Sequence, residues 1–246
     1  MKEKDLFIAD AHLLDPGDAN YRRLLTFLDE QRGRIRTLYL LGDIFDFWFG
    51  YRHTVFAPYV PILEALRRIR EEGTEIVYVE GNHDFHMGPF FEQTLGCRIL
   101  PDGGEVRIDD ERIFIAHGDL VRPDDPGYRL LRRCLRSRPL NWLMRLIPPD
   151  WAWSVARWAS RQSQKTHHVD RNKGQSEATL ASFARQRFAE GYRAVVTGHF
   201  HSPMIRTSEE GTLVALGDWI DQFSYAVYED GAFSLRSFKG AGSKTD

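Results

Sequence analysis

The chain has 246 residues, which is enough for one large α/β domain or for a domain with a sizeable insertion. Its apolar content of 42% can build a real hydrophobic core and excludes a disordered protein. The net charge of −2 gives no indication of a nucleic-acid partner, and two cysteines provide no disulfide framework, so we expect a reducing compartment.

The first half of the chain alternates between short apolar runs and a helical pattern. Its N-terminal segment is charged and then strand-like, without the apolar stretch and cleavage site of a signal peptide. Apolar residues between Ile62 and Ile69 repeat at helical spacing, and Gly73 follows as a C-terminal cap. The predicted strands are Leu6–Ala9, Thr37–Leu41, Glu75–Val79 and Arg112–Ala116.

The segment 122–173 differs from the rest of the chain. It has twelve Lys/Arg and four Asp/Glu, a net charge of +8, so the remainder carries −10. Pro148-Pro149 interrupts it, and it holds four of the six tryptophans: Trp142, Trp151, Trp153 and Trp158. We expect a basic, Trp-rich helical insertion, or lid, within a single domain of residues 1–246. Its tryptophans either lie at an interface between water and lipid or pack the lid onto the body.

The C-terminal part returns to the alternating pattern. Apolar residues from Leu180 to Phe188 have helical spacing, and Gly191 ends that helix. The strands that we predict after it are Ala194–Thr197, Thr212–Leu216, Tyr225–Tyr228 and Phe233–Arg236. No uncharged run reaches the roughly 18 residues that a membrane-spanning helix needs, so we expect a protein in the cytoplasm or resting on a membrane face.

Five polar clusters each follow a predicted strand. They are Asp10-Ala-His12, Gly42-Asp43-Ile-Phe-Asp46, Gly81-Asn82-His83-Asp84, His117-Gly118-Asp119 and Gly198-His199-Phe-His201. Ligands bind at the carboxyl ends of strands in α/β sheets, so side chains from separate strands can converge there. A single cluster of this kind is a weak signal, whereas five in succession are hard to explain as loops.

The residue types in these clusters predict a metal centre. Imidazole nitrogens and carboxylate or amide oxygens dominate and no thiolate is present, which favours Mn, Fe or Zn over Cu(I) or an iron–sulfur cluster. Two ions need a shared ligand, and Asp43 is the natural bridge because a carboxylate has two oxygens. The glycines beside Asp43, Asn82, His117 and His199 allow sharp backbone turns under the ions.

The order D-x-H, GD, GNH, a single His and GHxH resembles the calcineurin-like metallophosphoesterase superfamily. The resemblance implies a four-layer α/β/β/α sandwich and two divalent metal ions. By this resemblance, one ion binds Asp10, His12, Asp43 and His201. The other binds Asp43, Asn82, His117 and His199.

The chemistry expected of such a site is phosphoester hydrolysis, in which two ions turn water into a nucleophile and hold the phosphoryl oxygens. His83 should face the leaving-group oxygen, and either protonates it or neutralises its charge. We expect Asp84 to orient His83, and Asn82 to contact substrate as well as metal. Asp46 and Asp119 either support the metal ligands or form structural turns.

A closer resemblance extends over almost the whole chain. The stretches ADAHL, GDIFDFWFG, GNHDF, GHFHSP and LGDW are similar to those of the UDP-2,3-diacylglucosamine pyrophosphohydrolases of lipid A synthesis. That family cleaves its substrate at the α-phosphorus, giving UMP and 2,3-diacylglucosamine 1-phosphate. Its members are typically Mn-dependent, lie on the cytoplasmic face of the inner membrane, and hold the acyl chains under a helical cap. The resemblance therefore implies a UDP-linked glycolipid substrate and peripheral association with an anionic membrane.

The insertion fits a diacyl glycolipid. Its apolar residues would form a channel and a membrane approach: Trp142, Leu143, Ile147, Trp151, Trp153 and Trp158. Its cations would face lipid phosphates or the substrate diphosphate: Arg157, Arg161, Lys165 and Lys173. Asp125 and Tyr128, at matching family positions, would contact the glucosamine or shape the pocket.

One residue departs from the closer family. Its best-known members have Arg after the motif Asn, where this chain has His83. Arg is a permanent cation, whereas His can donate a proton and lose its charge. The difference leaves open another nucleotide-diphosphate lipid or a soluble nucleotide as substrate. A catalytically silent metal-binding scaffold is a third alternative, although such scaffolds usually lose ligands.

Overall fold

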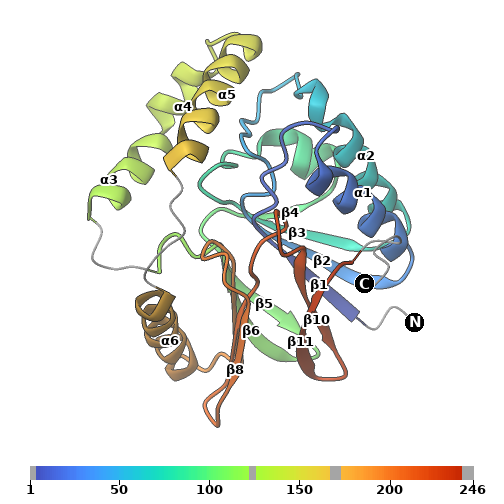
Figure 1. The fold of residues 1–246 in the computed structure, drawn as a ribbon, viewed down its shortest axis with the longest axis vertical. Helices are drawn as coiled ribbons and strands as arrows, with labels where there is room; N and C mark the ends of the chain where they lie inside the picture. The colour runs from blue at the N-terminus through green and yellow to red at the C-terminus, as the bar shows by residue number, and fades with distance from the viewer. Residues whose placement is uncertain (1–3, 122–125, 167–172, 240–246) are drawn as a thin grey trace.

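The computed structural model describes residues 4–121, 126–166 and 173–239, and of 159–166 and 173–176 it describes the backbone alone. Two β-sheets with helices on their outer faces form the body (Figure 1). The first sheet has the order β11-β10-β1-β2-β3-β4, in which β1 to β4 are parallel and β10 and β11 are antiparallel. Its strands are β1 (Lys4–Ile8), β2 (Ile35–Leu41), β3 (Glu75–Val79), β4 (Arg98–Leu100), β10 (Ser224–Glu229) and β11 (Ala232–Ser237).

The second sheet has the order β5-β6-β7-β9-β8. Its strands are β5 (Gly104–Ile108), β6 (Glu111–Ala116), β7 (Ala194–Thr197), β8 (Met204–Thr207) and β9 (Thr212–Ala215). The three central strands β6, β7 and β9 are parallel, and the edge strands β5 and β8 are antiparallel to their neighbours. The carboxyl ends of the parallel strands therefore lie at one edge of each sheet.

The alternation of side chains along β1 shows how the layers are packed. Leu6 and Ile8 belong to the core under the helices α1 (Ala19–Gln31) and α2 (Val60–Glu71). Phe7 and Ala9 point the other way, into the core between the two sheets. Helix α6 (Lys173–Ala189) covers the outer face of the second sheet with Leu180 and Ala184. These layers confirm the predicted α/β/β/α sandwich.

Three further helices belong to neither helical layer: α3 (Pro126–Leu135), α4 (Arg138–Met144) and α5 (Pro149–Thr166), which we call the cap. They stand apart from both sheets at the upper left of Figure 1. Trp153 anchors the cap, because its ring lies 5.1 Å from that of Phe56 and 5.3 Å from that of Tyr59 (centroid distances). Tyr59 belongs to the short helix η1 (Ala57–Tyr59), and η2 (Phe90–Thr94) follows β3.

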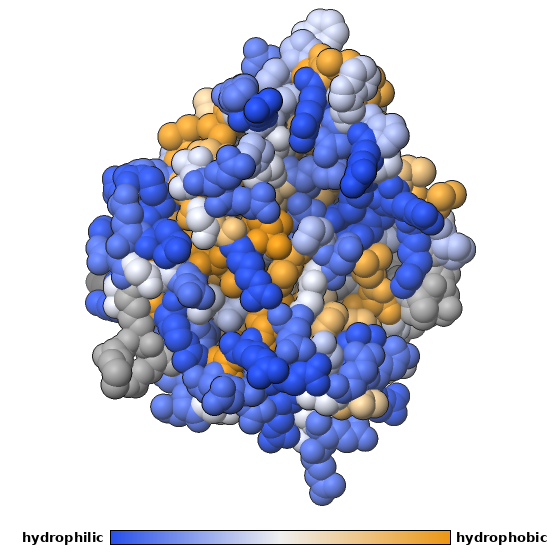
Figure 2. All heavy atoms as spheres, turned by 180° about the vertical axis from the view of Figure 1, so that it is seen from behind, coloured by the Kyte–Doolittle hydropathy of each residue, from blue (hydrophilic) through white to orange (hydrophobic). Residues whose placement is uncertain are grey.

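The surface of the cap is unusually apolar. In Figure 2, where the cap lies at the upper right, hydrophobic side chains reach the surface beside strongly hydrophilic ones. Among the described side chains of the cap and its α4–α5 connection, nine large apolar ones are exposed: Leu130, Leu131, Leu135, Trp142, Leu143, Leu146, Trp151, Val155 and Trp158. Of the four cap tryptophans, Trp153 packs onto the body, whereas Trp142, Trp151 and Trp158 are exposed, so their predicted place at a water–lipid interface stays a prediction. Within the described ranges, no helix has the length and apolar character to cross a membrane.

Candidate metal centre

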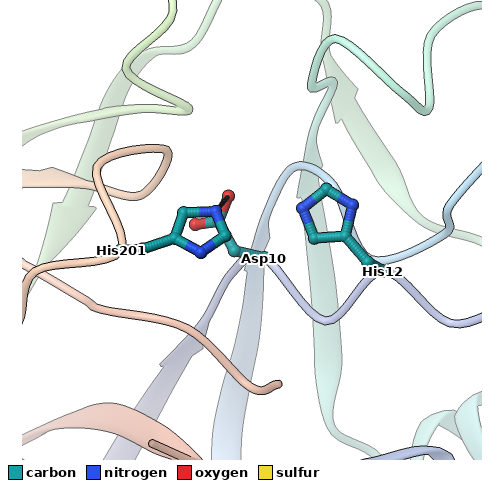
Figure 3. Close-up of side chains that lie close together, drawn as sticks. All are labelled: Asp10, His12 and His201. Carbon is teal, nitrogen blue, oxygen red and sulfur yellow. Dashed lines mark ion pairs between the residues drawn. The ribbon is translucent and has the colours of Figure 1, made fainter. Parts of the chain in front are cut away.

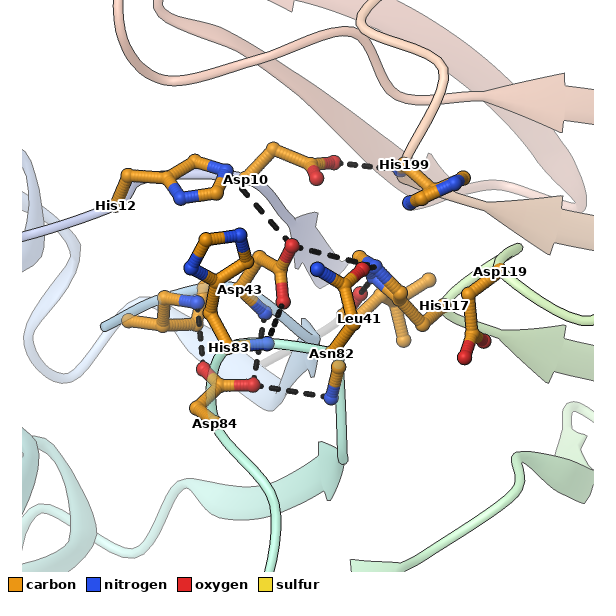
Figure 4. Close-up of polar contacts among 12 residues, drawn as sticks. Asp10, His12, Leu41, Asp43, Asn82, His83, Asp84, His117, Asp119 and His199 are labelled. Atoms are coloured by element: carbon orange, nitrogen blue, oxygen red, sulfur yellow. Dashed lines mark hydrogen bonds and ion pairs between the residues drawn. The ribbon is translucent and has the colours of Figure 1, made fainter. Parts of the chain in front are cut away.

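The polar clusters found in the sequence meet at the carboxyl ends of five strands. Asp10 and His12 follow β1, Asp43 follows β2 and Asn82 follows β3 in the first sheet. In the second sheet, His117 follows β6, and His199 and His201 follow β7. Figure 4 shows most of these side chains pointing toward one another between the two sheet edges. The sandwich therefore brings together all seven residues that the sequence predicts as metal ligands.

Asp43 lies at the centre of this group. Its Oδ2 is 3.5 Å from His117 Nε2 and 3.8 Å from His12 Nε2 (Figure 4), and only 2% of the residue is exposed. Burial alone would raise the pKa of the Asp43 carboxyl, but the imidazoles of His117 and then His12 lower it well below its ordinary value. One carboxylate thus faces ligands from both halves of the site, as a bridging residue must.

Asp10 lies on the side of the site formed by β1 and β7. Its Oδ1 is 3.5 Å from His201 Nε2, and Figure 3 shows the two side chains together with His12 opposite them. The backbone N–H of His199 donates to Asp10 Oδ2 at 2.7 Å. Oδ1 is buried and accepts no hydrogen bond from the described part of the chain. A buried carboxylate oxygen left in this state is well suited to bind a cation.

His117 and Asn82 lie on the other side of Asp43. His117 Nδ1 is 2.9 Å from the carbonyl of Leu41, and this contact fixes the imidazole so that Nε2 faces the centre. Nε2 is 3.1 Å from Asn82 Oδ1, and the His117 and His199 rings have centroids 5.0 Å apart. Burial lowers the pKa of His117, but the carboxylates of Asp43 and Asp10 outweigh it and raise the pKa to about 10. The site therefore strongly attracts positive charge.

Three overlapping sets of side chains have the geometry to hold a metal ion, with ligand atoms within 4.8 Å of one another. They are Asp10, His12 and His201; His12, Asp43 and His83; and Asp43, His117 and His199. The sharing of His12 and Asp43 between sets fits two neighbouring ions. The donors are nitrogen and carboxylate oxygen, which suit Mn, Fe or Zn.

The backbone at the site is strained in a way that favours function over stability. Five of the seven predicted ligands adopt positive φ, which costs free energy for a residue other than glycine. These are Asp10 (53°), His12 (44°), Asp43 (54°), His199 (70°) and His201 (48°). Gly81 is needed for space, because a Cβ there would lie 2.1 Å from Asp43 Oδ1. The sequence predicts a glycine beside Asn82 for a sharp turn, whereas the structure requires Gly81 for a close approach to Asp43.

His83 stands beside the predicted ligands. Its backbone N–H donates to Asp43 Oδ1 at 2.9 Å, and its Nδ1 lies 2.9 Å from the carbonyl of Asp46. Its ring meets that of His12 edge-on with centroids 4.8 Å apart. Burial lowers the pKa of His83, but Asp43 and the Asp46 carbonyl raise it by more than burial lowers it. The net shift of the His83 pKa is therefore upward. An imidazole with a raised pKa next to the predicted metal ligands suits a proton donor.

The prediction that Asp84 orients the His83 ring is wrong. The Nδ1 atom of His83 faces Asp46 instead, whose carboxylate Oδ1 is also 3.9 Å from His12 Nδ1. Asp84 is fully buried, and its oxygens accept backbone N–H groups of Asp43 (2.9 Å) and Gly81 (3.0 Å), those of residues 44 and 45, and the Tyr78 hydroxyl. Burial and then Asp43 raise the pKa of Asp84 to about 7. Asp84 thus joins the two loops that carry Asp43 and Asn82.

Asp218 is a supporting residue that the sequence reasoning missed. Its Oδ2 lies 3.8 Å from His201 Nδ1, while its Oδ1 accepts backbone N–H groups of residues 220–222. The available signal was a Gly-Asp pair directly after a strand, here β9, as in Gly42-Asp43 after β2. Asp119, one of the predicted supporting residues, instead accepts the Tyr128 hydroxyl and the Arg132 guanidinium, both at 2.7 Å.

The structure describes the side chains of only some of the cap residues that we predict to contact substrate. The Tyr128 hydroxyl donates to Asp119, which places Tyr128 at the edge of the site. Arg157 is half-buried on α5, and its Nε–H donates to no partner among the described residues. Asp125 lies outside the described residues, as do the side chains of Arg161, Lys165 and Lys173. Their predicted contacts with substrate therefore stay predictions.

The fold and the converging ligands define a class of protein that the comparisons identify. The family model for calcineurin-like phosphoesterases matches residues 6–203, and the chain belongs to this family. It is therefore a metal-dependent hydrolase of phosphoesters. One solved structure, an archaeal phosphodiesterase, aligns with 96% of this chain and 99% of its own at a TM-score of 0.50 and 15% identity, which supports the shared fold.

Curated relatives carry a more specific name. A UDP-2,3-diacylglucosamine hydrolase of Pseudomonas entomophila is 32% identical over 240 residues, covering 95% of this chain and 98% of the relative. The protein of the same name from Pseudomonas aeruginosa PAO1 is 31% identical over 229 residues, covering 92% and 94%. That of Aeromonas salmonicida is 30% identical over 236 residues, covering 92% and 90%. The alignments thus extend over nearly the whole chain.

Proposed function

We propose that this phosphoesterase hydrolyses UDP-2,3-diacylglucosamine to UMP and 2,3-diacylglucosamine 1-phosphate, a step of lipid A synthesis. The observation that carries the proposal is the placement of an apolar cap beside the centre formed around Asp43. Relatives named for this substrate, similar over nearly their whole length, support it. The reaction consumes one water: its oxygen bonds to the α-phosphorus, the bond from that phosphorus to the bridging oxygen breaks, and the lipid phosphate leaves.

The proposed ion sites use the seven side chains that meet around Asp43, divided as the family resemblance implies. One divalent ion would be held by Asp10, His12, Asp43 and His201, and the other by Asp43, Asn82, His117 and His199. Mn²⁺ is the proposed native ion, because these nitrogen and oxygen donors suit it and the resembling family uses it. When bound, the pair of ions supplies Lewis acidity that lowers the pKa of water and binds phosphoryl oxygens. Asn82 also contacts the substrate phosphate in this proposal.

His83 supplies the proton for the leaving group in the proposed reaction. Its Nδ1 is held by the Asp46 carbonyl, which orients the ring, and Asp43 and this carbonyl raise the pKa of the imidazole above its ordinary value. The proton on Nε2 then passes to, or hydrogen-bonds with, the oxygen of the departing lipid phosphate. Imidazole in place of the guanidinium found in the best-known lipid A enzymes adds the ability to transfer that proton.

The cap gives the protein its access to a lipid substrate in this proposal. Exposed Trp142, Trp151 and Trp158 enter the interfacial layer of an anionic membrane, on the cytoplasmic face of the inner membrane. A groove of about 640 Å³ lined by Leu130, Leu140 and Leu143 offers apolar surface for hydrocarbon. The basic residues predicted to meet phosphates are Arg157, Arg161, Lys165 and Lys173, with Asp125 and Tyr128 near the glucosamine.

Isotope labelling tests both the substrate and the site of attack. The enzyme is incubated with UDP-2,3-diacylglucosamine and Mn²⁺ in ¹⁸O-water, with UDP-N-acetylglucosamine as the matched substrate without acyl chains. We expect equal amounts of UMP and lipid phosphate, with the label in UMP, and little reaction of the non-acylated substrate. Label in the lipid phosphate would contradict attack at the α-phosphorus. Equal rates on both substrates would favour a soluble nucleotide as the natural substrate.

A further inference from the structure

Helix α3 has two different faces. Leu130 and Leu131 on its outer side are 64% and 56% exposed. Arg132 and Arg136, one helical turn apart, have side chains only 13% exposed and turn toward the body. Guanidinium groups are rarely buried unless they are paired, so their partners define what the inner face of α3 holds.

Arg136 joins α3 to the loop that carries Asn82 and His83. Its Nη1 donates to Glu80 Oε2 at 2.6 Å and to the Pro101 carbonyl at 2.8 Å, and its Nη2 donates to the Gly81 carbonyl at 2.9 Å. The side chain of Glu80 is only 6% exposed. A charged pair shielded to this degree, with three directed hydrogen bonds, fixes geometry far better than an ion pair at the surface.

Glu80 closes the same loop at its other end. Its Oε1 accepts the backbone N–H of Met87 at 3.0 Å, so one side chain ties residue 80 to residue 87 across Asn82 and His83. Gly81 is held on both sides, because its N–H donates to Asp84 at 3.0 Å while its carbonyl accepts from Arg136. Gly81 also packs directly against the Asp43 carboxylate. A shift of Arg136 would therefore move the peptide that leads into Asn82.

A second clamp lies one turn earlier on α3. Arg132 Nε donates to Asp119 Oδ2 at 2.7 Å, and the same carboxylate accepts the Tyr128 hydroxyl. Asp119 is two residues after His117. The inner face of α3 thus holds two loops that bring ligands from different sheets, Asn82 from the first and His117 from the second.

We propose that Arg136, acting through Glu80 and the Gly81 carbonyl, is a positioning residue for phosphoester cleavage. Docking of α3 is then a condition for turnover itself and not only for holding a lipid. The consequence is that hydrolysis of a small, water-soluble diester depends on this arginine although such an ester needs no cap to bind. The inference rests on the phosphoesterase family alone, so it stands even if the proposed lipid substrate is wrong.

The test uses the full chain, loaded with Mn²⁺, and bis-p-nitrophenyl phosphate as substrate. We expect Arg136→Met to lower kcat by on the order of 10²-fold, because small misplacements of reacting groups cost about this much. KM should change little, and so should metal content per folded chain. Arg136→Lys should recover only part of kcat, since an ammonium group keeps the charge but cannot reproduce the forked contacts. The matched control Arg138→Met removes an exposed cap arginine and should keep the kcat of the parent.

A double-mutant cycle distinguishes loss of the specific link between Glu80 and Arg136 from a general loss of folding. Glu80→Gln removes the charge but keeps an acceptor for Met87, so the loop stays closed at that end. Because Glu80→Gln and Arg136→Met break the same link, the double variant should lose no more kcat than the worse single variant. Additive losses, or a kcat unchanged per folded and metal-loaded enzyme, would overturn the proposal and leave the clamp a purely structural contact.

Discussion

Asp43 is the residue on which both halves of the metal centre depend. Its Oδ1 accepts the His83 backbone N–H while its Oδ2 faces His12 and His117. The residue itself sits at a φ of 54°, held there by the hydrogen bond from its N–H to Asp84. The strain is maintained by partners on three strands, which is expected where an arrangement serves binding rather than stability.

Replacing Asp43 by Ala should deplete both ions. The shared carboxylate is the only negatively charged group in two of the three candidate sets, so its loss takes the only charged ligand from one ion and the bridging ligand from the other. Elemental analysis of the purified protein measures this, with Asp10→Ala as the comparison because Asp10 belongs to one set alone. If Asp43→Ala retained one tightly held ion per chain, the residue would not be a bridge.

His83→Ala should separate proton transfer from metal binding. With the other ligands untouched, metal content should stay near that of the parent, while kcat falls by about 10²- to 10⁴-fold, the usual contribution of a positioned acid or base. Steady-state kinetics with UDP-2,3-diacylglucosamine, alongside metal analysis of the same sample, measure both quantities. A variant that loses its metal would show that His83 is a ligand, as its place beside His12 and Asp43 also permits.

The seven ligand positions could be predicted from the sequence because each follows a strand whose apolar run is plain. The hydrogen-bond and ion-pair partners of the carboxylates could not be predicted in this way. Asp84 is next to His83 in the chain, yet its buried oxygens face the loop after β2, and only the packing of β2 beside β3 makes that contact. Asp218 reaches His201 from a strand of the same sheet, across a distance that the sequence does not encode.

At the scale of elements, strands buried on both faces were predicted well, whereas of the four edge strands only β11 was predicted. Strands β3 and β7 have the predicted bounds, because their apolar residues form an uninterrupted run. The strands β4, β5 and β8 were missed, since each lies at a sheet edge and mixes charged with apolar residues. The helix α1 was also missed, although its buried Tyr21, Leu24 and Leu28 do have helical spacing.

The cap tryptophans should divide into two groups when mutated. Trp153→Ala removes a ring packed on Phe56 and Tyr59 and should cost about 3–5 kcal/mol of unfolding free energy. Trp142→Ser and Trp158→Ser, at 65% exposure each, should change it by no more than about 0.5 kcal/mol each. Urea denaturation measures both.

The same exposed tryptophans should matter for membranes. The Trp142/Trp158 double serine variant should bind anionic vesicles more weakly than the parent, because indole rings favour the interfacial layer. Vesicle cosedimentation, with zwitterionic vesicles as the control, measures this. If the variant sedimented with anionic vesicles as fully as the parent does, the apolar face of the cap would not be the membrane contact.

Across the whole molecule, the metal centre joins the two sheets at the end of the apolar core that they share. Asp10 and Asp43 from the first sheet and His117 from the second are all at most 2% exposed. Burying two carboxylates this close together is unfavourable unless positive charge compensates them. Bound cations should therefore stabilise the sandwich as a whole and not merely complete its active site.

Metal removal should lower the thermal stability of the entire protein. A ligand that binds only the folded state at 100 times its Kd adds about 2.7 kcal/mol per site. For a chain of this size each kcal/mol shifts Tm by roughly 2–4 °C, so chelation should lower Tm by at least about 5 °C, and restored Mn²⁺ should reverse it. Differential scanning calorimetry at constant ionic strength measures the shift. The Asp43→Ala variant should respond far less, whereas an equal response would place the stabilising ions somewhere other than the strand ends around Asp43.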